Sequence, residues 1–263
     1  MRLLVIGGSG YVGRLVLPGL AARHQVRVLD LHRPSVDCEY REGDATDPTE
    51  LSRACAGMDA VIHMAMAPTS PDERVDPSVA FDVHVKSPYL TVLAAAKADV
   101  AHVVFVSSLS VFAQLGSRRL GADEEPDATE PYGLTKRLGE QSARAAATST
   151  GTDLTVLRLA WPTPDDAWPA WAVGLARTGP ISTEGAMRRD PVTAADPRPP
   201  LRLADGRPVP ALAGTDLTAA LLGALDHRPD GIRTLPLTGD ASGALVDLSG
   251  TMTALDWRPT HQL

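Results

Sequence analysis

Two side chains suited to proton transfer stand four residues apart in a stretch with helical spacing. Tyr132 and Lys136 would face the same side of a helix over residues 132–148, because residues four apart on a helix are neighbours. A tyrosine hydroxyl has an unperturbed pKa of about 10, and a neighbouring ammonium lowers it toward neutrality. Ser108 follows a β-rich run at 100–106 and supplies a hydroxyl that can orient a substrate oxygen. The three residues predict acid–base chemistry at a hydroxyl-bearing carbon, with Tyr132 as the acid or base.

A glycine-rich turn near the N-terminus is the first element expected to position this chemistry. The apolar run 3–6 ends in three glycines spaced three apart, Gly7, Gly10 and Gly13. Gly7 and Gly10 let the backbone turn tightly beside an anion, and Gly13 lets the following helix pack on the strand. This spacing predicts a dinucleotide cradle, the alternative being a βα turn with no ligand. The residues expected to contact the cofactor there are Gly7, Gly10, Tyr11, Val12 and Gly13.

A carboxylate follows the second predicted strand. Asp30 ends the run 26–29, at the distance from the glycines where a ribose diol would lie. Asp30 would bond a free 2′-hydroxyl and repel a 2′-phosphate, whereas Arg33 would attract that phosphate. Because Asp30 stands at the strand end and Arg33 in a turn before Pro34, the sequence predicts NAD rather than NADP.

Asp44 and Ala45 are also expected to contact the cofactor. They follow Gly43 in a turn that leads to a helix at about 50–55, with Asp47 as its expected N-cap. Asp44 could bond an adenine amino group, and a purely local turn role explains it equally well.

The strand pattern at 59–67 runs into small residues. Met64 and Ala65 would therefore pass beside the cofactor at the carboxyl edge of a parallel sheet. His63, within the same run, is expected to be a structural histidine at a strand end rather than a catalytic one.

In combination, these positions resemble the extended short-chain dehydrogenase/reductase family, also called the NAD-dependent epimerase/dehydratase family. The likeness covers residues 1–160 and rests on the glycine triplet, Asp30 and the Tyr132-x-x-x-Lys136 spacing. Further matching positions are Gly43, Asp44, His63, Ala65, Ser107, Ser108, Val111, Phe112, Leu157, Arg158 and Leu159. The resemblance implies that Tyr132 and Lys136 contact the cofactor as well as the substrate, with Lys136 on the nicotinamide ribose. It also implies a possible homodimer through helices at 79–98 and 132–148.

Three positions depart from the family pattern. His84 stands where the family has an asparagine, which removes an asparagine-based proton relay and leaves His84 as its substitute. Trp161 replaces an asparagine found in members that act on nucleotide sugars, and Phe112 replaces a tyrosine. These departures bear on the substrate more than on the cofactor.

The alternation of strand and helix patterns predicts an α/β fold, a Rossmann-type doubly wound parallel sheet with a small C-terminal lobe. We expect residues 1–160 to bind NAD and residues 161–263 to form a substrate-binding lobe that is interwoven with the first part as one structural unit.

The C-terminal lobe carries weaker signals. Residues 178–210 lose apolar periodicity and indicate a long loop, whose arginines are either solvated or an anion site. Thr215 is the expected N-cap of a helix at 217–225, residues 235–237 form a short strand candidate, and Trp257 is expected to anchor the tail. The arginines of the loop are Arg188, Arg189, Arg198 and Arg202.

Composition excludes several classes of protein. The chain has 263 residues, a net charge of −7 and no block of like charges, which argues against nucleic acid or an acidic membrane surface as a partner. Cys38 and Cys55 are too few for a disulfide framework and stand outside any metal-binding motif, so no metal site is expected. The opening apolar run is too short for a signal peptide, and no run approaches a membrane span. A cytoplasmic protein without membrane attachment is expected.

The function expected from these residues is an NAD-dependent oxidoreductase or epimerase acting on a small polar, sugar-like molecule. A uronic acid is the sharpest candidate, because Trp161 would narrow the site and the loop arginines could bind one carboxylate. The alternatives are a nucleotide-sugar epimerase or dehydratase and a regulatory protein that binds the cofactor without turnover. The sequence leaves open whether hydride is kept by the cofactor or returned to the substrate.

Overall fold

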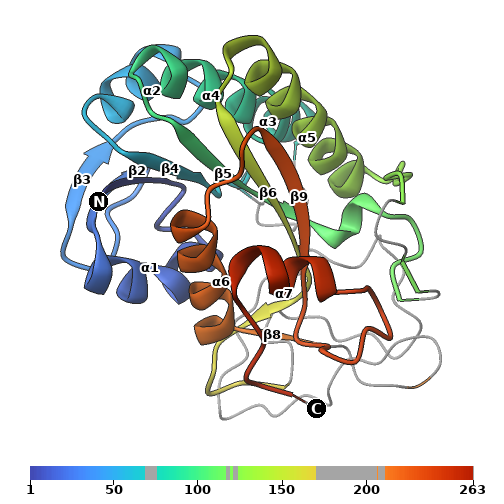
Figure 1. Cartoon of the computed structure of the whole chain (residues 1–263). Helices are drawn as coiled ribbons and strands as arrows, with labels where there is room; N and C mark the ends of the chain where they lie inside the picture. The colour runs from blue at the N-terminus through green and yellow to red at the C-terminus, as the bar shows by residue number, and fades with distance from the viewer. Residues whose placement is uncertain (69–75, 117–118, 121–123, 170–205, 207–210, 263) are drawn as a thin grey trace.

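The centre of the molecule is a parallel sheet of seven strands. In the computed structural model, which describes residues 1–68, 76–116, 119–120, 124–169, 206 and 211–262, the strand order is β3-β2-β1-β4-β5-β6-β9 (Figure 1). The strands are β1 (Arg2–Ile6), β2 (Gln25–Asp30), β3 (Glu39–Glu42), β4 (Ala60–His63), β5 (His102–Ser108), β6 (Asp153–Leu159) and β9 (Ile232–Leu237). The order reverses between β1 and β4, where open α/β sheets bind their ligands. The predicted doubly wound, Rossmann-type fold is confirmed.

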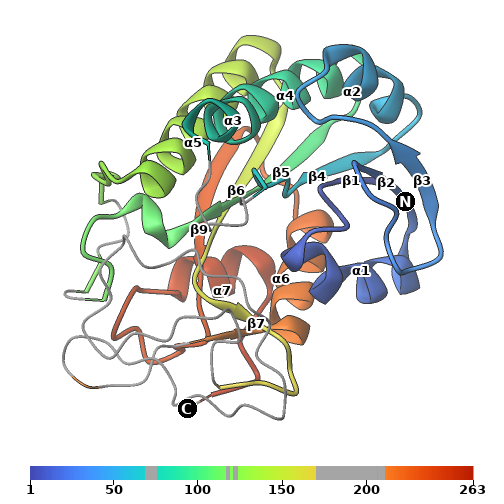
Figure 2. The same cartoon turned by 180° about the vertical axis from the view of Figure 1, so that it is seen from behind.

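Helices cover both faces of this sheet (Figures 1 and 2). One layer contains α2 (Pro48–Cys55), α3 (Pro77–Phe81), α4 (Ser87–Lys97) and α5 (Pro131–Thr150), and the other contains α1 (Tyr11–Arg23), α6 (Gly214–Asp226) and α7 (Ser249–Leu255). Leu3 and Val5 of β1 are buried in the core on the α1 side, and Leu4 and Ile6 in the core on the α2 side. A strand buried on both faces needs an unbroken apolar run, which explains the sequence of β1.

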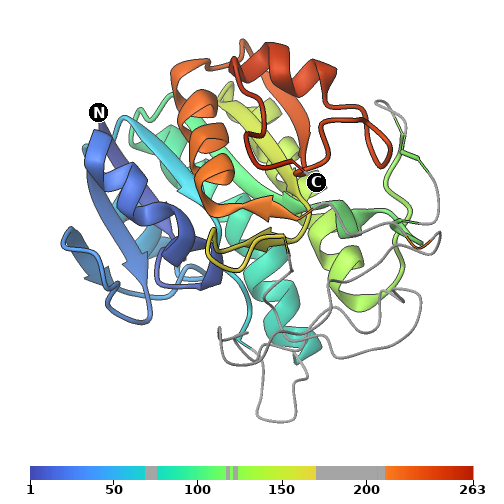
Figure 3. The same cartoon turned by 90° about the horizontal axis from the view of Figure 1, so that it is seen from below.

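The C-terminal part of the chain is built into the same sheet. β9 pairs in parallel with β6, so the candidate strand at 235–237 is confirmed and begins three residues earlier. Pro236 lies opposite Arg158, and its carbonyl oxygen accepts a bond from Thr251 Oγ1 of α7 at 2.9 Å. Figure 3 shows α6 between α1 and α7. The core on the α1 side therefore contains residues from both ends of the chain.

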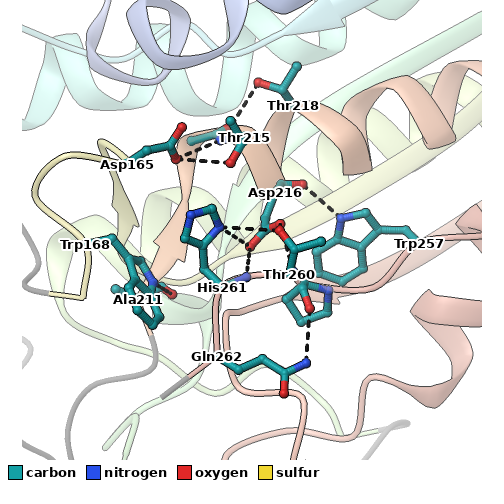
Figure 4. Close-up of polar contacts among 12 residues, drawn as sticks. Asp165, Trp168, Ala211, Thr215, Asp216, Thr218, Trp257, Thr260, His261 and Gln262 are labelled. Atoms are coloured by element: carbon teal, nitrogen blue, oxygen red, sulfur yellow. Dashed lines mark hydrogen bonds and ion pairs between the residues drawn. The ribbon is translucent and has the colours of Figure 1, made fainter.

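The tail is anchored as expected. Trp257 is buried, and its indole Nε1 donates to the carbonyl oxygen of Asp216 at 2.9 Å (Figure 4). The buried Asp216 carboxylate accepts from the backbone N–H groups of Thr260 and His261, at 2.9 and 3.0 Å. These bonds hold the tail residues 257–261 against the first turn of α6.

The expected cap of α6 is wrong. The helix begins at Gly214, with Ala213 at the N-cap, so Thr215 lies inside the first turn and cannot cap it. Asp165 Oδ1 instead accepts from the Thr215 backbone N–H at 3.0 Å and from its hydroxyl at 3.2 Å (Figure 4). A side chain 50 residues earlier therefore supplies the acceptor that the free helix N–H group needs.

The helix expected at 79–98 is also more complex than its apolar spacing indicates. The chain forms α3, then a π-helical turn at η1 (Asp82–Lys86), and then α4. A π turn carries one extra residue per turn and shifts which side chains face the sheet. His84, which stands where the family has an asparagine, lies in this π turn. The loop expected at 178–210 lies outside the described residues except for Gly206, and so do its four arginines.

Candidate active site

A cleft of about 450 Å³ opens at the carboxyl ends of β1, β2, β4, β5 and β6, within the size range of small-molecule sites. It brings together residues predicted from six separate stretches of sequence. Those that line it are Gly7, Gly10, Tyr11, Val12, Asp30, Asp44, Ala45, Met64, Ala65, Ser108, Tyr132 and Lys136. Gly13 does not line the cleft, so it can act on a ligand only through the turn that it supports.

The glycine turn is fixed by contacts between backbones. Gly7 has φ of 81°, and a Cβ on it would lie 2.5 Å from Ala65 N, which no side chain could tolerate. A Cβ on Gly13 would lie 2.0 Å from the carbonyl oxygen of Gly8. Gly10 is the N-cap of α1 and has no side chain between the helix N-terminus and the cleft. This turn fits a pyrophosphate, since it leaves backbone N–H groups and the positive end of α1 facing open space.

Asp30 stands at the cleft wall where β2 ends. Its Oδ2 accepts from Ser9 N at 2.9 Å and its Oδ1 from His32 N at 3.0 Å, so the carboxylate is held across the glycine turn. The guanidinium of Arg33 lies 5.5 Å from the ring centroid of Tyr40 and does not line the cleft. Asp30, which would repel a 2′-phosphate, therefore lines the cleft, whereas Arg33, which would attract it, does not.

Asp44 has the local turn contact expected for it, and its expected contact with an adenine stays a prediction. Its Oδ1 accepts from Thr46 N at 2.8 Å, which is a local turn contact, and the residue also lines the cleft. Asp47 caps α2, as expected, by accepting from the backbone N–H groups of Thr49 and Glu50. Tyr11 links the glycine turn to the far wall through its hydroxyl, which donates to Pro162 O at 2.9 Å.

Tyr132 and Lys136 lie on the first two turns of α5, as the spacing predicted. Glu130 caps this helix by accepting from the backbone N–H groups of Tyr132 and Gly133. Lys136 is 3% exposed, and its Nζ donates to Val106 O at 2.7 Å and lies 4.9 Å from the ring centroid of Phe105. Burial lowers the pKa of the Lys136 ammonium to about 8. An ammonium in this position can stabilise a tyrosinate on the preceding turn.

The two adjacent serines of β5 face different partners. Ser107 donates its hydroxyl to Glu140 Oε1 at 2.6 Å, whereas Ser108 Oγ accepts from Ser110 N at 3.1 Å and lines the cleft. Both residues line the cleft, but side chains alternate along a strand, and the Ser107 hydroxyl is directed to Glu140. Ser108, the predicted residue, keeps its hydroxyl proton available for a substrate oxygen.

The two histidines near the site are both buried. His63 Nε2 lies 2.7 Å from Ser87 Oγ, and burial lowers the pKa of His63 to about 3, which agrees with the structural role expected for it. His84 Nε2 accepts the Ala67 N–H at 3.1 Å, so the ring proton lies on Nδ1 and bonds Thr135 Oγ1 at 2.9 Å. His84 also meets the Tyr132 ring edge-on, with centroids 5.9 Å apart. Protein atoms engage both its ring nitrogens, and its expected role in place of the relay asparagine stays a prediction.

Trp161 lines the cleft beside Pro162 and has φ of 44°. The residue is 7% exposed, so it belongs to the core and also forms a wall of the cleft. Phe112 does not line the cleft, and its ring lies 5.0 Å from the guanidinium carbon of Arg158.

In the part of the chain that the structure describes, no three His, Cys, Asp or Glu side chains gather as metal ligands would. No helix among the described segments is long and apolar enough to cross a membrane.

A family model described as the NAD dependent epimerase/dehydratase family matches residues 3–162, more than half of the chain. The chain belongs to this family. The matched residues contain the glycine turn, Asp30, Ser108, Tyr132 and Lys136, which are the residues that the cleft brings together.

Relatives within and around this family differ in substrate. An L-arabinose 1-dehydrogenase (NAD(P)(+)) of Haloferax volcanii is 29% identical over 173 residues, which are 61% of this chain and 66% of that protein. A (4-alkanoyl-5-oxo-2,5-dihydrofuran-3-yl)methyl phosphate reductase of Streptomyces griseus is 32% identical over 221 residues, 81% of this chain and 64% of that protein. The chain thus spans less than two thirds of either relative. The structure of uronate dehydrogenase from Agrobacterium tumefaciens has the same fold, with a TM-score of 0.72 at 19% identity, covering 99% of this chain and 85% of that one.

Sequence reasoning missed the buried groups behind the candidate catalytic side chains, Tyr132 and Lys136. Glu140, Arg158 and Thr135 were not expected to act near the site, although Glu140 stands four residues after Lys136. That spacing placed a carboxylate on the face of α5 that carries Tyr132 and Lys136, and it was the signal available.

Proposed function

We propose that this protein catalyses NAD-linked hydride transfer at a hydroxyl or carbonyl carbon of a small polar molecule. The observation that carries the proposal is that Tyr132 and Lys136 line the same cleft as the glycine turn and Asp30. A proton-transfer pair beside a dinucleotide cradle is the arrangement that oxidation of an alcohol requires, because the hydroxyl proton and the hydride leave in different directions.

The side chains divide the work. When bound, NAD accepts the hydride. Ser108 donates to the substrate oxygen and orients it, while Tyr132 takes the hydroxyl proton. Lys136 stabilises the tyrosinate electrostatically and would hold the cofactor's ribose. Glu130 fixes the first turn of α5, so the Tyr132 backbone is held in place while its hydroxyl reacts.

NAD is proposed over NADP. The Asp30 carboxylate lies at the cleft wall and would repel a 2′-phosphate, and Arg33 packs over Tyr40 outside the cleft lining. Calorimetric titration with both cofactors tests this choice, and NADP binding as tight as NAD would overturn it.

A small acidic sugar such as a uronic acid is the proposed substrate. Trp161 offers a flat apolar face and a single N–H donor, which suits a compact ring better than a nucleotide diphosphate. The similarity to an arabinose dehydrogenase supports a free sugar. The sequence supplies Arg188, Arg189, Arg198 and Arg202 as candidate partners for one carboxylate.

A less polar carbonyl compound is the second candidate. The cleft wall includes Met66, Pro68, Val79, Val83 and Leu115, and this apolar lining favours an alkyl or ring substituent on the substrate. The reductase from Streptomyces griseus, whose named substrate carries an alkanoyl chain, supports this reading.

One assay separates these possibilities. NADH formation would be followed over uronic acids, neutral sugars, UDP-sugars and secondary alcohols, and NADH consumption over the matching ketones. We expect turnover with a uronic acid and none with a UDP-sugar. Turnover restricted to alkyl ketones favours the second candidate, and micromolar binding of UDP-sugars without a response to small sugars contradicts both. Tight NAD binding without turnover on any compound favours a regulatory protein.

A homodimer through α3, α4 and α5 is proposed as well. Phe81 and Tyr89 are 44% and 39% exposed on α3 and α4, which leaves apolar side chains on the surface expected to pair. Light scattering at micromolar concentration tests it, and a monomer would contradict it.

A further inference from the structure

Glu140 is a buried carboxylate directly behind the proton-transfer pair. It is 2% exposed and lies on α5, one turn after Lys136. Its Oε2 accepts from Arg158 Nη2 at 2.7 Å, and its Oε1 accepts from Arg158 Nε at 3.0 Å and from Ser107 Oγ at 2.6 Å. These three bonds fix the carboxylate between α5, β5 and β6.

The same strand holds both Lys136 and Glu140. Val106 accepts from Lys136 Nζ through its carbonyl oxygen, and the next residue, Ser107, donates to Glu140. Ser107 lies opposite Arg158 in the β5–β6 register, so the guanidinium approaches the carboxylate from the neighbouring strand. A displacement of Glu140 would therefore disturb the peptide that positions the Lys136 ammonium.

The buried Lys136 ammonium is stabilised only if a negative charge lies near it. Arg158 contributes a second buried cation, while His63 on β4 is kept neutral by burial and His84 on η1 is engaged through both ring nitrogens. Tyr132 on the preceding turn carries negative charge only after it gives up its proton. Glu140 is the carboxylate that faces Lys136 from α5, and its charge acts to keep the ammonium protonated against burial.

We propose that Glu140 is a positioning residue for hydride transfer: its carboxylate, oriented by Ser107 and Arg158, keeps the buried Lys136 charged and aimed at the active cleft. The inference rests on the proposed function for its catalytic meaning. The effect of Glu140 on the charge of Lys136 involves only residues of this chain and can be measured without a substrate.

The chain contains only three lysines, which makes the charge of Lys136 directly measurable. Lysine labelled with ¹³C at Cε gives three signals, assigned with Lys86→Arg and Lys97→Arg, and each signal is followed as pH rises. We expect the Lys136 signal to titrate near pH 8. In Glu140→Gln, the Lys136 transition should move down by about 1 to 3 pH units, with the signals of Lys86 and Lys97 as internal references.

A second variant guards against loss of folding. Glu140→Gln leaves Arg158 buried without its partner, whereas Glu140→Leu combined with Arg158→Met replaces the ion pair by apolar side chains, which cores often tolerate. This double variant also removes the Arg158 cation, so it should lower the Lys136 transition by less than Glu140→Gln does. An unchanged or raised transition in either folded variant would overturn the proposal.

Activity then supplies a second readout. On a substrate from the assay above, the alkaline fall of kcat should move to lower pH in Glu140→Gln by the same shift that the Lys136 signal shows. A purely structural residue would reduce the amount of active protein and leave the pH profile in place. If the Lys136 signal shifts but no compound is turned over, the proposed function fails and the coupling between Glu140 and Lys136 stands. If a compound is turned over but the Lys136 signal does not shift, the proposed function stands and the coupling fails.

Discussion

The two halves of the cleft are held in place by different forces. Around the glycine turn, backbone meets backbone: a Cβ on Gly7 or Gly13 would fall within 2.5 Å of another main-chain atom. Around Tyr132 and Lys136, the contacts are between buried side chains and charges, namely Lys136, Glu140 and Arg158. The half proposed to hold the cofactor is thus specified by the absence of side chains, and the half proposed to be catalytic by side chains that are costly to bury. We call them the cofactor half and the catalytic half.

This difference predicts different responses to substitution. Where backbone atoms are in close contact, an added methyl group should lower stability equally at every pH. Where charges are buried, stability should depend on pH and on any change of charge. Variants in each half therefore test whether the two halves differ in this way.

The largest effect is expected from Tyr132→Phe. Only the proton-transferring oxygen is lost, and the ring that meets His84 is kept, so kcat should fall by about 10²- to 10⁴-fold while NAD affinity changes little. Steady-state kinetics and calorimetry measure the two effects, with the exposed Tyr89→Phe as the matched control. Ordinary activity in Tyr132→Phe would move the acid–base role to another residue.

Gly13→Ala should act on stability and on NAD binding together. The added methyl would lie 2.0 Å from Gly8 O, and relieving this overlap costs about 3 kcal/mol of unfolding free energy and deforms the turn. Gly250→Ala in α7 is the control, because a Cβ there meets nothing within 4 Å and should be neutral or slightly stabilising. Urea unfolding of both variants tests the difference, which should be independent of pH.

Lys136→Met should instead stabilise the protein without cofactor, in a way that depends on pH. The folded-state pKa is about 8 and the unfolded value about 10.4, so below pH 8 the folded state bears the whole cost of the buried charge. The gain in unfolding free energy should be about 1 to 3 kcal/mol below pH 8 and should vanish as pH rises through 10.4. A gain in unfolding free energy that stays constant between about pH 8 and 10.4 would show that burying the Lys136 charge does not cost the folded state this energy.

Asp30→Asn should have the smallest effect. An amide can still accept from Ser9 N but no longer repels a 2′-phosphate, so the preference for NAD over NADP should fall by about tenfold, or ~1.4 kcal/mol. Titration of both cofactors measures the ratio, and the exposed Asp37→Asn is the control. An unchanged ratio would assign the preference to other residues.

The sequence predicted the fold, and the meeting of the glycine turn and Asp30 at one cleft, because both depend on local patterns. The apolar run of β1, the glycine spacing and the carboxylate after β2 each follow from a few neighbouring residues. The partners of the catalytic half come from distant elements, as with Ser107, Glu140 and Arg158, and no local pattern encodes their meeting. The same reason explains the wrong cap at Thr215, whose acceptor Asp165 lies 50 residues away in sequence. The π turn was missed because apolar spacing over 79–98 does not distinguish it from an α-helix.

Pro236 has a consequence for how copies of this chain behave toward one another. β9 is the last strand of the sheet, and exposed strand edges invite pairing with a second molecule. In a strand, the carbonyl and the nitrogen of one residue point to the same side, and the Pro236 carbonyl bonds Thr251 on α7. The nitrogen that cannot donate therefore faces outward, away from β6, where it costs the sheet no hydrogen bond. At the opposite edge, β3 is four residues long and carries Glu39, Arg41 and Glu42. Both margins of the sheet are thus poor templates for edge-to-edge aggregation.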